Sequence, residues 1–302
     1  MNKYINVSTI MKKQARDLNK FVLDTESRYR GQLFTLAERI LNKNNVKIVL
    51  LCGPSCAGKT TTAKLLKSVL ELKGREVDVI SMDDFFMDLD KRKPLPNGQP
   101  DFDSPDILDY DLMKSCFSKY FAGEDVKFPE YDFKASKSIH DAKPYKYKFN
   151  SIVIFEGIHV LNPRVLESLG TSNYFRIYVS PLQSFKDDTF ALSTKNLRLL
   201  RRSIRDIDRR NTPVKKTMEI WPEVIDVEEK FIEPYRTKVD YYVDTMHEYE
   251  LGVYKGEIER FVAEGKVNRE DVPFINLLKN LDPISKSIIP DTSLMWEFVS
   301  KN

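Results

Sequence analysis

The sequence predicts an α/β protein built as a three-layer sandwich, in which a mainly parallel five-stranded sheet lies between two layers of helices. Short apolar runs, typical of strands buried on both faces, alternate with longer helix-prone segments. The connections are long enough to bring each strand back parallel to the one before it. The five predicted strands are residues 46–51, 77–82, 151–155, 174–179 and 240–244.

Helices and one hairpin fill the predicted connections. Residues 60–72 carry apolar side chains at helical spacing, and residues 106–121 are also predicted to be helical. The proline-rich residues 93–105 predict a loop. Residues 126–149 alternate aromatic and lysine side chains, which indicates a β-hairpin inserted between two strands of the sheet.

The chain is expected to have three regions. Residues 1–44 form a helical lead-in, because Leu33, Leu36 and Ile40 follow helical spacing. Residues 45–263 form the main domain, and residues 264–302 form a helical tail packed on it.

The bulk composition excludes several classes of protein. A net charge of +3, from 48 basic and 45 acidic residues, does not by itself indicate a nucleic-acid partner. The three cysteines, Cys52, Cys56 and Cys116, are too few for a disulfide framework, so we expect reduced thiols and a cytoplasmic location. No apolar run approaches the roughly 20 residues that span a bilayer, so no membrane partner is expected.

A phosphate-binding loop lies between the first predicted strand and the helix after it. The segment reads G-x-x-x-x-G-K-[ST], in which glycines let backbone N–H groups surround phosphates and the helix presents its N-terminus to them. The lysine reaches the β- and γ-phosphates of a nucleotide, and the threonine hydroxyl ligates Mg²⁺. The expected nucleotide-binding residues are Gly53, Pro54, Ser55, Cys56, Ala57, Gly58, Lys59, Thr60 and Thr61.

Acidic residues follow the second and third predicted strands. Asp83 and Asp84 come after one, and Glu156 after the other. The carboxyl ends of parallel strands meet at one edge of a sheet, where the phosphate loop also lies. We therefore expect Thr60, Asp83 and Glu156 to converge on Mg²⁺, and one Asp, which we take to be Asp83, to accept a proton from an attacking hydroxyl. The alternative is that the Asp pair only caps a turn.

The densest basic segment, residues 195–216, places five arginines at three- and four-residue spacing: Arg198, Arg201, Arg202, Arg205 and Arg209. Three interpretations stay open. The helix is a solvated surface helix, an RNA-binding arm, or a lid that closes arginines over transferring phosphates.

Several blocks in order resemble the uridine kinase and phosphoribulokinase family. They are residues 53–61, 80–86, 131–133, 155–158 and 201–206. Residues 157–163 and 290–298 are similar to bacterial uridine kinase-like nucleoside kinases. The resemblance implies that residues 45–263 are a P-loop nucleoside kinase domain with the hairpin over the substrate site and a helical lid.

The family implies ATP- and Mg²⁺-dependent phosphorylation of a nucleoside 5′-hydroxyl, with uridine or cytidine as the small-molecule partner. Asp83 would act as base, with Lys59, Arg202 and Arg205 as further catalytic residues. Thr60, Asp83 and Glu156 would hold the metal. The expected substrate-binding residues are Asp83, Phe86, Asp103, Tyr131, Phe133 and Arg202.

The chain departs from the family pattern at the base-reading end. Ser136 stands where pyrimidine kinases place a histidine, and His140 is the nearest histidine. Two alternatives therefore remain: a kinase of another small hydroxyl acceptor, such as a sugar phosphate or a pantothenate-like molecule, and a non-catalytic nucleotide-dependent RNA-binding regulator. Self-association is left open.

Overall fold

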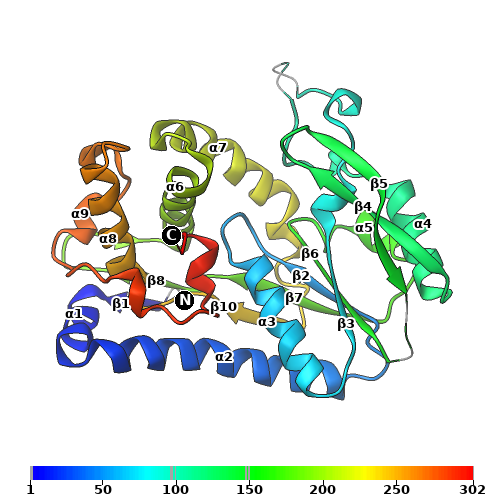
Figure 1. Ribbon diagram of the computed structural model, residues 1–302, viewed down its shortest axis with the longest axis horizontal. Helices are drawn as coiled ribbons and strands as arrows, with labels where there is room; N and C mark the ends of the chain where they lie inside the picture. The colour runs from blue at the N-terminus through cyan, green and yellow to red at the C-terminus, as the bar shows by residue number, and fades with distance from the viewer. Residues whose placement is uncertain (1–2, 96–97, 99, 147, 149, 302) are drawn as a thin grey trace.

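The computed structural model describes residues 3–95, 98, 100–146, 148 and 150–301. Its central sheet has five strands, every neighbouring pair of which is parallel, in the order β10-β7-β2-β6-β3 (Figure 1). The strands are β2 (Ile48–Cys52), β3 (Val77–Ser81), β6 (Ile152–Gly157), β7 (Tyr174–Ser180) and β10 (Tyr241–Asp244). The five strands and the parallel topology expected from the sequence are confirmed.

Two apolar cores cover the two faces of the sheet, because successive side chains of a strand point to opposite faces. Val49 and Leu51 of β2 enter one core, and Ile48 and Leu50 enter the other. The first core is completed by α2 (Leu18–Asn42), α3 (Lys59–Leu72), α6 (Thr194–Arg210) and α8 (Glu250–Ala263). The second is completed by α4 (Tyr110–Phe121), α5 (Pro163–Ser168) and the hairpin. The three-layer sandwich is thus confirmed.

The predicted hairpin is present as β4 (Asp125–Asp132) and β5 (Lys137–Lys146), which pair antiparallel. It lies beside α4 on the right of Figure 1. Residues 147 and 149 of the predicted segment, and residues 96, 97 and 99 of the predicted loop, lie outside the described residues. The predicted helix 106–121 begins only at Tyr110, after a single 3₁₀ turn at Pro105–Ile107.

A second, small sheet was not predicted. β1 (Lys3–Asn6) pairs parallel with β8 (Gln183–Lys186), which pairs antiparallel with β9 (Ala191–Leu192). Strands of two to four residues are too short to show a periodic pattern. β1 leads into α1 (Val7–Arg16), which is followed directly by α2, so helices make up most of residues 3–44.

The segment after α8 differs from the long helical tail expected from the sequence. It holds one α-helix, α9 (Ile275–Leu278), and the 3₁₀ turns Arg269–Asp271, Lys286–Ile288 and Leu294–Glu297. The turn Leu294–Glu297 lies beside α3 (Figure 1), and Arg209 of α6 donates to the carbonyl oxygen of Val299 just after it. The three-region division stays a prediction, since contacts cross both boundaries.

Two expectations from composition can be compared with the described residues. All three cysteines are buried free thiols, as expected. In the described ranges, each helix is too short or too polar to cross a bilayer.

A further helix, α7 (Val214–Phe231), follows α6 and packs against it.

Candidate active site

The two glycines of the phosphate loop are required by its geometry. A Cβ on Gly53 would lie 2.2 Å from the carbonyl oxygen of Val179 in β7, where backbone cannot yield. Gly58 has φ +94°, a left-handed conformation that favours glycine, and a Cβ there would meet the Leu294 side chain at 2.6 Å. The loop therefore turns tightly against the sheet before α3 begins at Lys59.

Side chains from outside the loop bind its outward carbonyl oxygens. Arg198 donates to Ser55 (3.2 Å), Arg201 to Cys56 (3.4 Å) and Thr245 to Ala57 (2.7 Å). These bonds hold the loop's shape and leave backbone N–H groups at the start of α3 for an anion, where the helix dipole also favours negative charge.

Helix α6 supplies both arginines, Arg198 and Arg201, and neither lies on a solvated surface. Arg198 is 1% exposed and pairs with Glu228, and Arg201 is fully buried against Glu250. The interpretation as a solvated surface helix is therefore wrong for this part of the arginine face. α6 packs beside the phosphate loop, where the lid interpretation also placed it.

The two arginines assigned to catalysis lie on the same helix, at the edge of the loop. Arg202 donates to the Ser55 hydroxyl at 3.1 Å, and Arg205 is bound to Asp206 at 2.9 Å. The Arg202 charge acts on the buried carboxyl of Asp103, where it opposes the rise in pKa that burial causes. The structure thus places Arg202 against the loop, with its charge acting on a predicted substrate-binding residue.

Thr60, Glu156 and Asp83 gather at the carboxyl edge of the sheet, as expected for parallel strands. The Thr60 hydroxyl donates to Glu156 Oε1 at 3.1 Å, and Glu156 pairs in register with Ser81 at the end of β3. Burial raises the pKa of Glu156 to about 7 and that of Asp83 to about 6, while the nearby Lys59 charge opposes both shifts. Lys59 itself donates to the Pro54 carbonyl at 3.1 Å.

The two adjacent aspartates differ in what they contact. Asp84 pairs with Lys143 of β5 at 2.9 Å and accepts from the Tyr131 backbone N–H at 3.4 Å, so it ties the hairpin to the sheet edge. In the described part of the chain, no hydrogen bond reaches the Asp83 carboxylate. Asp84 is thus the aspartate of the pair that is tied to the hairpin, and the choice of Asp83 as the base stays a prediction.

Three aromatic residues meet at the hairpin. The Phe86 ring lies 5.5 Å from Tyr131 and 6.4 Å from Phe133, and the latter two are 5.1 Å apart, all in edge-to-face contact. Phe86 and Tyr131 are buried, while Phe133 is 64% exposed. Together they form an apolar wall of the kind that holds a planar ring.

Neither Ser136, at the position where a base-contacting histidine is expected, nor the nearest histidine, His140, supplies an imidazole to this wall. Ser136 has φ +55° in the hairpin turn, and its carbonyl accepts from Leu89 N at 3.1 Å. His140 is exposed on β5. Another histidine, His159, is buried beside Asp103, whose carbonyl it contacts at 2.6 Å.

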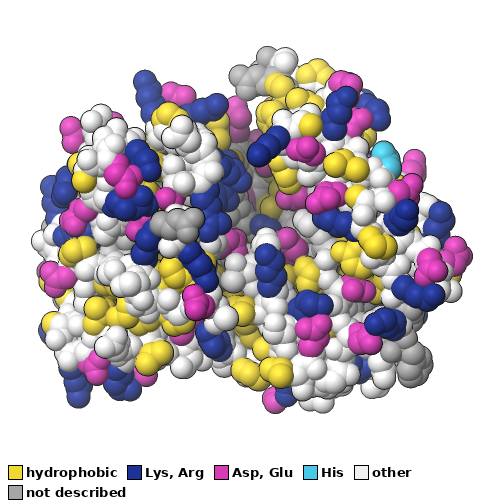
Figure 2. Space-filling view, in the orientation of Figure 1, with side chains coloured by type: hydrophobic (Ala, Val, Ile, Leu, Met, Phe, Trp, Pro, Cys, Tyr) yellow, Lys and Arg dark blue, Asp and Glu magenta, His cyan; other side chains and the backbone are white. Residues whose placement is uncertain are grey.

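Figure 2 shows a hollow in the molecular surface between the half that carries α6 and α7 and the half that carries the hairpin. Lys and Arg side chains gather along the α6 side of this hollow. Negative groups of a nucleotide would be attracted there.

Comparison with known proteins identifies the family. Residues 48–251, well over half of the chain, match the Phosphoribulokinase / Uridine kinase family. The chain belongs to this family. The match covers the phosphate loop, both acidic positions, the hairpin and α6.

Several curated relatives of this chain are uridine kinases by name. The chain is 30% identical over 198 residues to the uridine kinase of Chlamydia pneumoniae, and this match covers 64% of the chain and 79% of that protein. It is also 30% identical over 188 residues to uridine kinase-like protein 5 of Arabidopsis thaliana, a match that covers 62% of the chain. The match spans only 35% of the Arabidopsis protein and 24% of uridine-cytidine kinase A of Dictyostelium discoideum.

One solved structure shares the fold of this chain: a candidate fructose transport system kinase from Silicibacter sp. TM1040. The two have a TM-score of 0.52 and 19% sequence identity, and the match covers 70% of this chain and 98% of that one. At this identity the likeness concerns the fold alone.

The donor atoms at the sheet edge fit Mg²⁺. The Thr60 hydroxyl and the carboxylates of Asp83 and Glu156 are oxygen ligands, which this small hard cation prefers, and it usually keeps waters and substrate phosphates as well. Among the described residues, no group of three or more His, Cys, Asp or Glu side chains forms a metal site by itself. The chain itself therefore offers few ligands to Mg²⁺, and waters and substrate phosphates would complete the set.

Arg92 is a buried residue beside the aromatic wall that the sequence did not single out. Its guanidinium lies over the rings of Phe86 and Tyr131, at 5.3 and 5.1 Å, and donates to the Tyr131 hydroxyl and to the carbonyls of Met87 and Asp101. It is 8% exposed, and no carboxylate of the described chain pairs with it. Arg92 lies just before the predicted loop of residues 93–105 and outside every predicted strand and helix, so no periodic pattern marked it.

Replacing Arg92 with Met is expected to raise the KM for the acceptor roughly tenfold, the scale of one lost hydrogen bond to a charged group, while kcat falls less. The Tyr131 ring would lose the stacked guanidinium and the donor that fix its orientation. Steady-state kinetics with the acceptor varied at saturating ATP would measure this. The exposed Lys91→Met is the matched control, and an unchanged acceptor KM in Arg92→Met would contradict the assignment.

The stability of the nucleotide-free protein is expected to fall as pH rises from about 4 to above 7. The folded-state pKa values of Asp83 (about 6) and Glu156 (about 7) lie above the ordinary values of 3.8 and 4.5. The folded protein therefore binds more protons than the unfolded chain in this window, so raising the pH through the folded pKa removes stability.

Melting temperatures measured in nucleotide-free buffer at pH 5 and pH 8 check this. The decrease in Glu156→Gln should be smaller than in the wild type, and the surface variant Glu38→Gln should behave like the wild type. Equal decreases in Glu156→Gln and the wild type would show that Glu156 titrates normally.

Proposed function

We propose that this kinase transfers the γ-phosphate of ATP to the 5′-hydroxyl of a nucleoside, with uridine or cytidine as the acceptor, in cytoplasmic pyrimidine salvage. The observation that carries the proposal is the Asp83 carboxylate, which has no hydrogen-bond partner among the described residues and lies within the influence of the Lys59 charge in the phosphate loop. The names of the curated relatives support the acceptor class. The free thiols support the location.

The residues then have distinct roles. Lys59 and the N–H groups of residues 53–61 bind the phosphates, and Thr60, Asp83 and Glu156 would hold Mg²⁺, which when bound neutralises developing phosphate charge. Asp83, with its pKa raised to about 6, is matched to accepting a hydroxyl proton near neutral pH. Arg202 and Arg205 would donate to the transferring group.

The acceptor side has its own set of residues. Tyr131, Phe86 and Phe133 hold the base, and Asp103 binds the ribose hydroxyls. Asp103 is half-buried, and burial raises the pKa of its carboxyl.

A coupled ADP-release assay across uridine, cytidine, adenosine, guanosine and thymidine tests the proposal. Turnover with at least one pyrimidine ribonucleoside, absent in Lys59→Ala, is the expected result. A folded protein that binds ATP but turns over none of the five would sink the nucleoside assignment.

A kinase of another small acceptor is the second candidate, and Arg92 is the observation that favours it. A buried guanidinium without a carboxylate partner in the described chain could pair with an acidic acceptor, such as a sugar phosphate or a pantothenate-like molecule. The same assay with those acceptors separates the two, since a fold alone does not fix the substrate.

The third candidate, a non-catalytic RNA-binding regulator, has less support. Arg198 and Arg201 are buried in ion pairs, and Arg209 donates to the carbonyl oxygens of Trp296 and Val299. Little of the arginine face is therefore free to neutralise a phosphate backbone.

A further inference from the structure

The segment of residues 290–300 makes a direct contact with the phosphate loop. The Glu297 carboxylate accepts a hydrogen bond from the backbone N–H of Thr61, at 3.0 Å. Thr61 lies in the first turn of α3, whose N–H groups have no partner inside the helix. In a phosphate loop these groups receive the α- and β-phosphates of the nucleotide. An acidic side chain of the chain itself therefore lies where a phosphate is expected.

Apolar packing places Glu297 against the loop. Leu294 touches the loop at Gly58, where the nearest side-chain carbon would lie 2.6 Å from a Cβ. Leu294, Met295 and Phe298 are fully buried. The Phe298 ring lies 4.6 Å from the guanidinium of Arg201, the residue that binds the Cys56 carbonyl. The segment is thus built into the loop's surroundings and is not a loose end.

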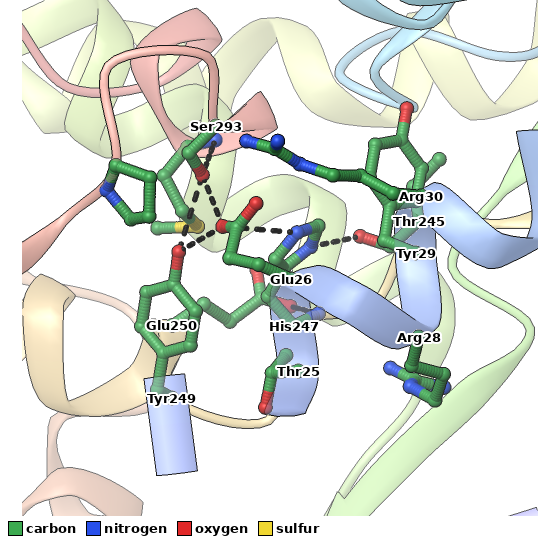
Figure 3. Close-up of polar contacts among 12 residues, drawn as sticks. Thr25, Glu26, Arg28, Tyr29, Arg30, Thr245, His247, Tyr249, Glu250 and Ser293 are labelled. Carbon is green, nitrogen blue, oxygen red and sulfur yellow. Dashed lines mark hydrogen bonds and ion pairs between the residues drawn. The ribbon is translucent and has the colours of Figure 1, made fainter. Parts of the chain in front are cut away.

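The part of the segment before Glu297 is fixed by a buried polar network. Ser293 and Tyr249 both donate to Oε1 of Glu26 on α2, and their own hydroxyls are 3.1 Å apart. His247 approaches the same carboxylate oxygen at 3.5 Å (Figure 3). Tyr29, one turn along α2, contacts the hydroxyl of Thr62, the residue after Thr61. The network therefore connects the start of the segment to the first turn of α3.

The part after Glu297 is held by the end of α6. Arg209 donates to the carbonyl oxygens of Trp296 and Val299, the latter at 2.7 Å, and Asp208 accepts from the Ser300 backbone N–H at 2.6 Å. These contacts join the segment to the end of α6 through its backbone carbonyl and N–H groups. α6 also carries Arg202 and Arg205, so a movement of this helix toward a nucleotide would shift the segment as well.

We propose that Glu297 is a built-in competitor of ATP: its carboxylate occupies a phosphate position of the loop, and nucleotide binding requires its displacement. The proposal rests on the proposed function, since it assumes that this loop binds ATP. One N–H group cannot donate fully to two anions, and a carboxylate beside a phosphate adds repulsion in a partly desolvated site. The hydrogen bond to Thr61 and the phosphate contact therefore exclude each other.

Binding of ATP to the full chain, measured by calorimetry without any acceptor, tests this. Glu297→Gln and Glu297→Ala are expected to bind ATP about tenfold more tightly than the wild type, the scale of one hydrogen bond to a charged group. Asp291→Asn is the matched control, because it removes the same charge from the same segment at a side chain that is 93% exposed. Its affinity should equal that of the wild type.

Hydrogen exchange of the wild type gives a second readout. Added ATP should speed exchange of the backbone amides of residues 294–300 and slow that of Thr61. Equal ATP affinity in the wild type and both Glu297 variants, weaker binding in the variants, or slower exchange of 294–300 with ATP would each overturn the competition. Absence of ATP binding in the folded wild type and in all variants would instead overturn the proposed function.

Discussion

Asp83→Asn is expected to remove phosphoryl transfer, lowering kcat roughly 10²- to 10⁴-fold, the usual contribution of a positioned base. Affinity for ATP should change little, because the phosphate loop is untouched. The amide keeps the size of the side chain but cannot take a proton from the acceptor hydroxyl. Single-turnover kinetics and ATP binding, measured on the same preparation, check both parts.

Asp84→Asn is the control for this variant, since it makes the same chemical change one residue along. Asp84 contacts Lys143 and the Tyr131 backbone, so its loss should loosen the hairpin and raise the acceptor KM more than it lowers kcat. If Asp83→Asn kept near-normal turnover, or if Asp84→Asn were the inactive variant, the assignment of the base would be wrong.

Glu250→Ala is expected to destabilise the fold by about 3–5 kcal/mol, because it leaves the Arg201 charge buried and unpaired. Both side chains are fully buried, and two guanidinium nitrogens bind the two carboxylate oxygens at 2.8 and 3.0 Å. Arg201 would also lose the orientation that holds the Cys56 carbonyl, so ATP binding should weaken at temperatures where the variant stays folded.

Urea unfolding followed by circular dichroism measures the first effect. Asp226→Ala, which removes an exposed helical pair with Lys230, should cost less than about 1 kcal/mol by comparison. The double variant Arg201→Met/Glu250→Leu should recover much of the loss, since it removes both charges together. A Glu250→Ala protein as stable as Asp226→Ala would show that the buried pair carries little of the folding energy.

The sequence contains enough to predict the central sheet and the loop, because both depend on local patterns. Val49 and its neighbours form a continuous apolar run, and the spacing of Gly53, Gly58 and Lys59 has a direct geometric meaning. The positions of Asp83 and Glu156 follow from parallel topology alone. These features need no information about distant parts of the chain.

Other features depend on partners far away in the sequence, and no local pattern reveals them. The spacing of Arg198 and Arg201 is the same for a solvated face as for a buried one, and their partners Glu228 and Glu250 are 30 and 49 residues away. Glu297 reaches Thr61 across 236 residues, from a segment without periodicity. Arg92 lies in a loop whose conformation depends on the hairpin.

The bond between Glu26 and Ser293 also bears on how the protein is made. These residues are 267 positions apart, and the residues next to Ser293 and those of α2 belong to the same core. A ribosome therefore has to reach residue 293 before α2 can meet this partner. Contacts of such long range slow folding and lengthen the time that apolar surface is exposed. We expect the nascent chain to depend on chaperones until residues 293–299 emerge.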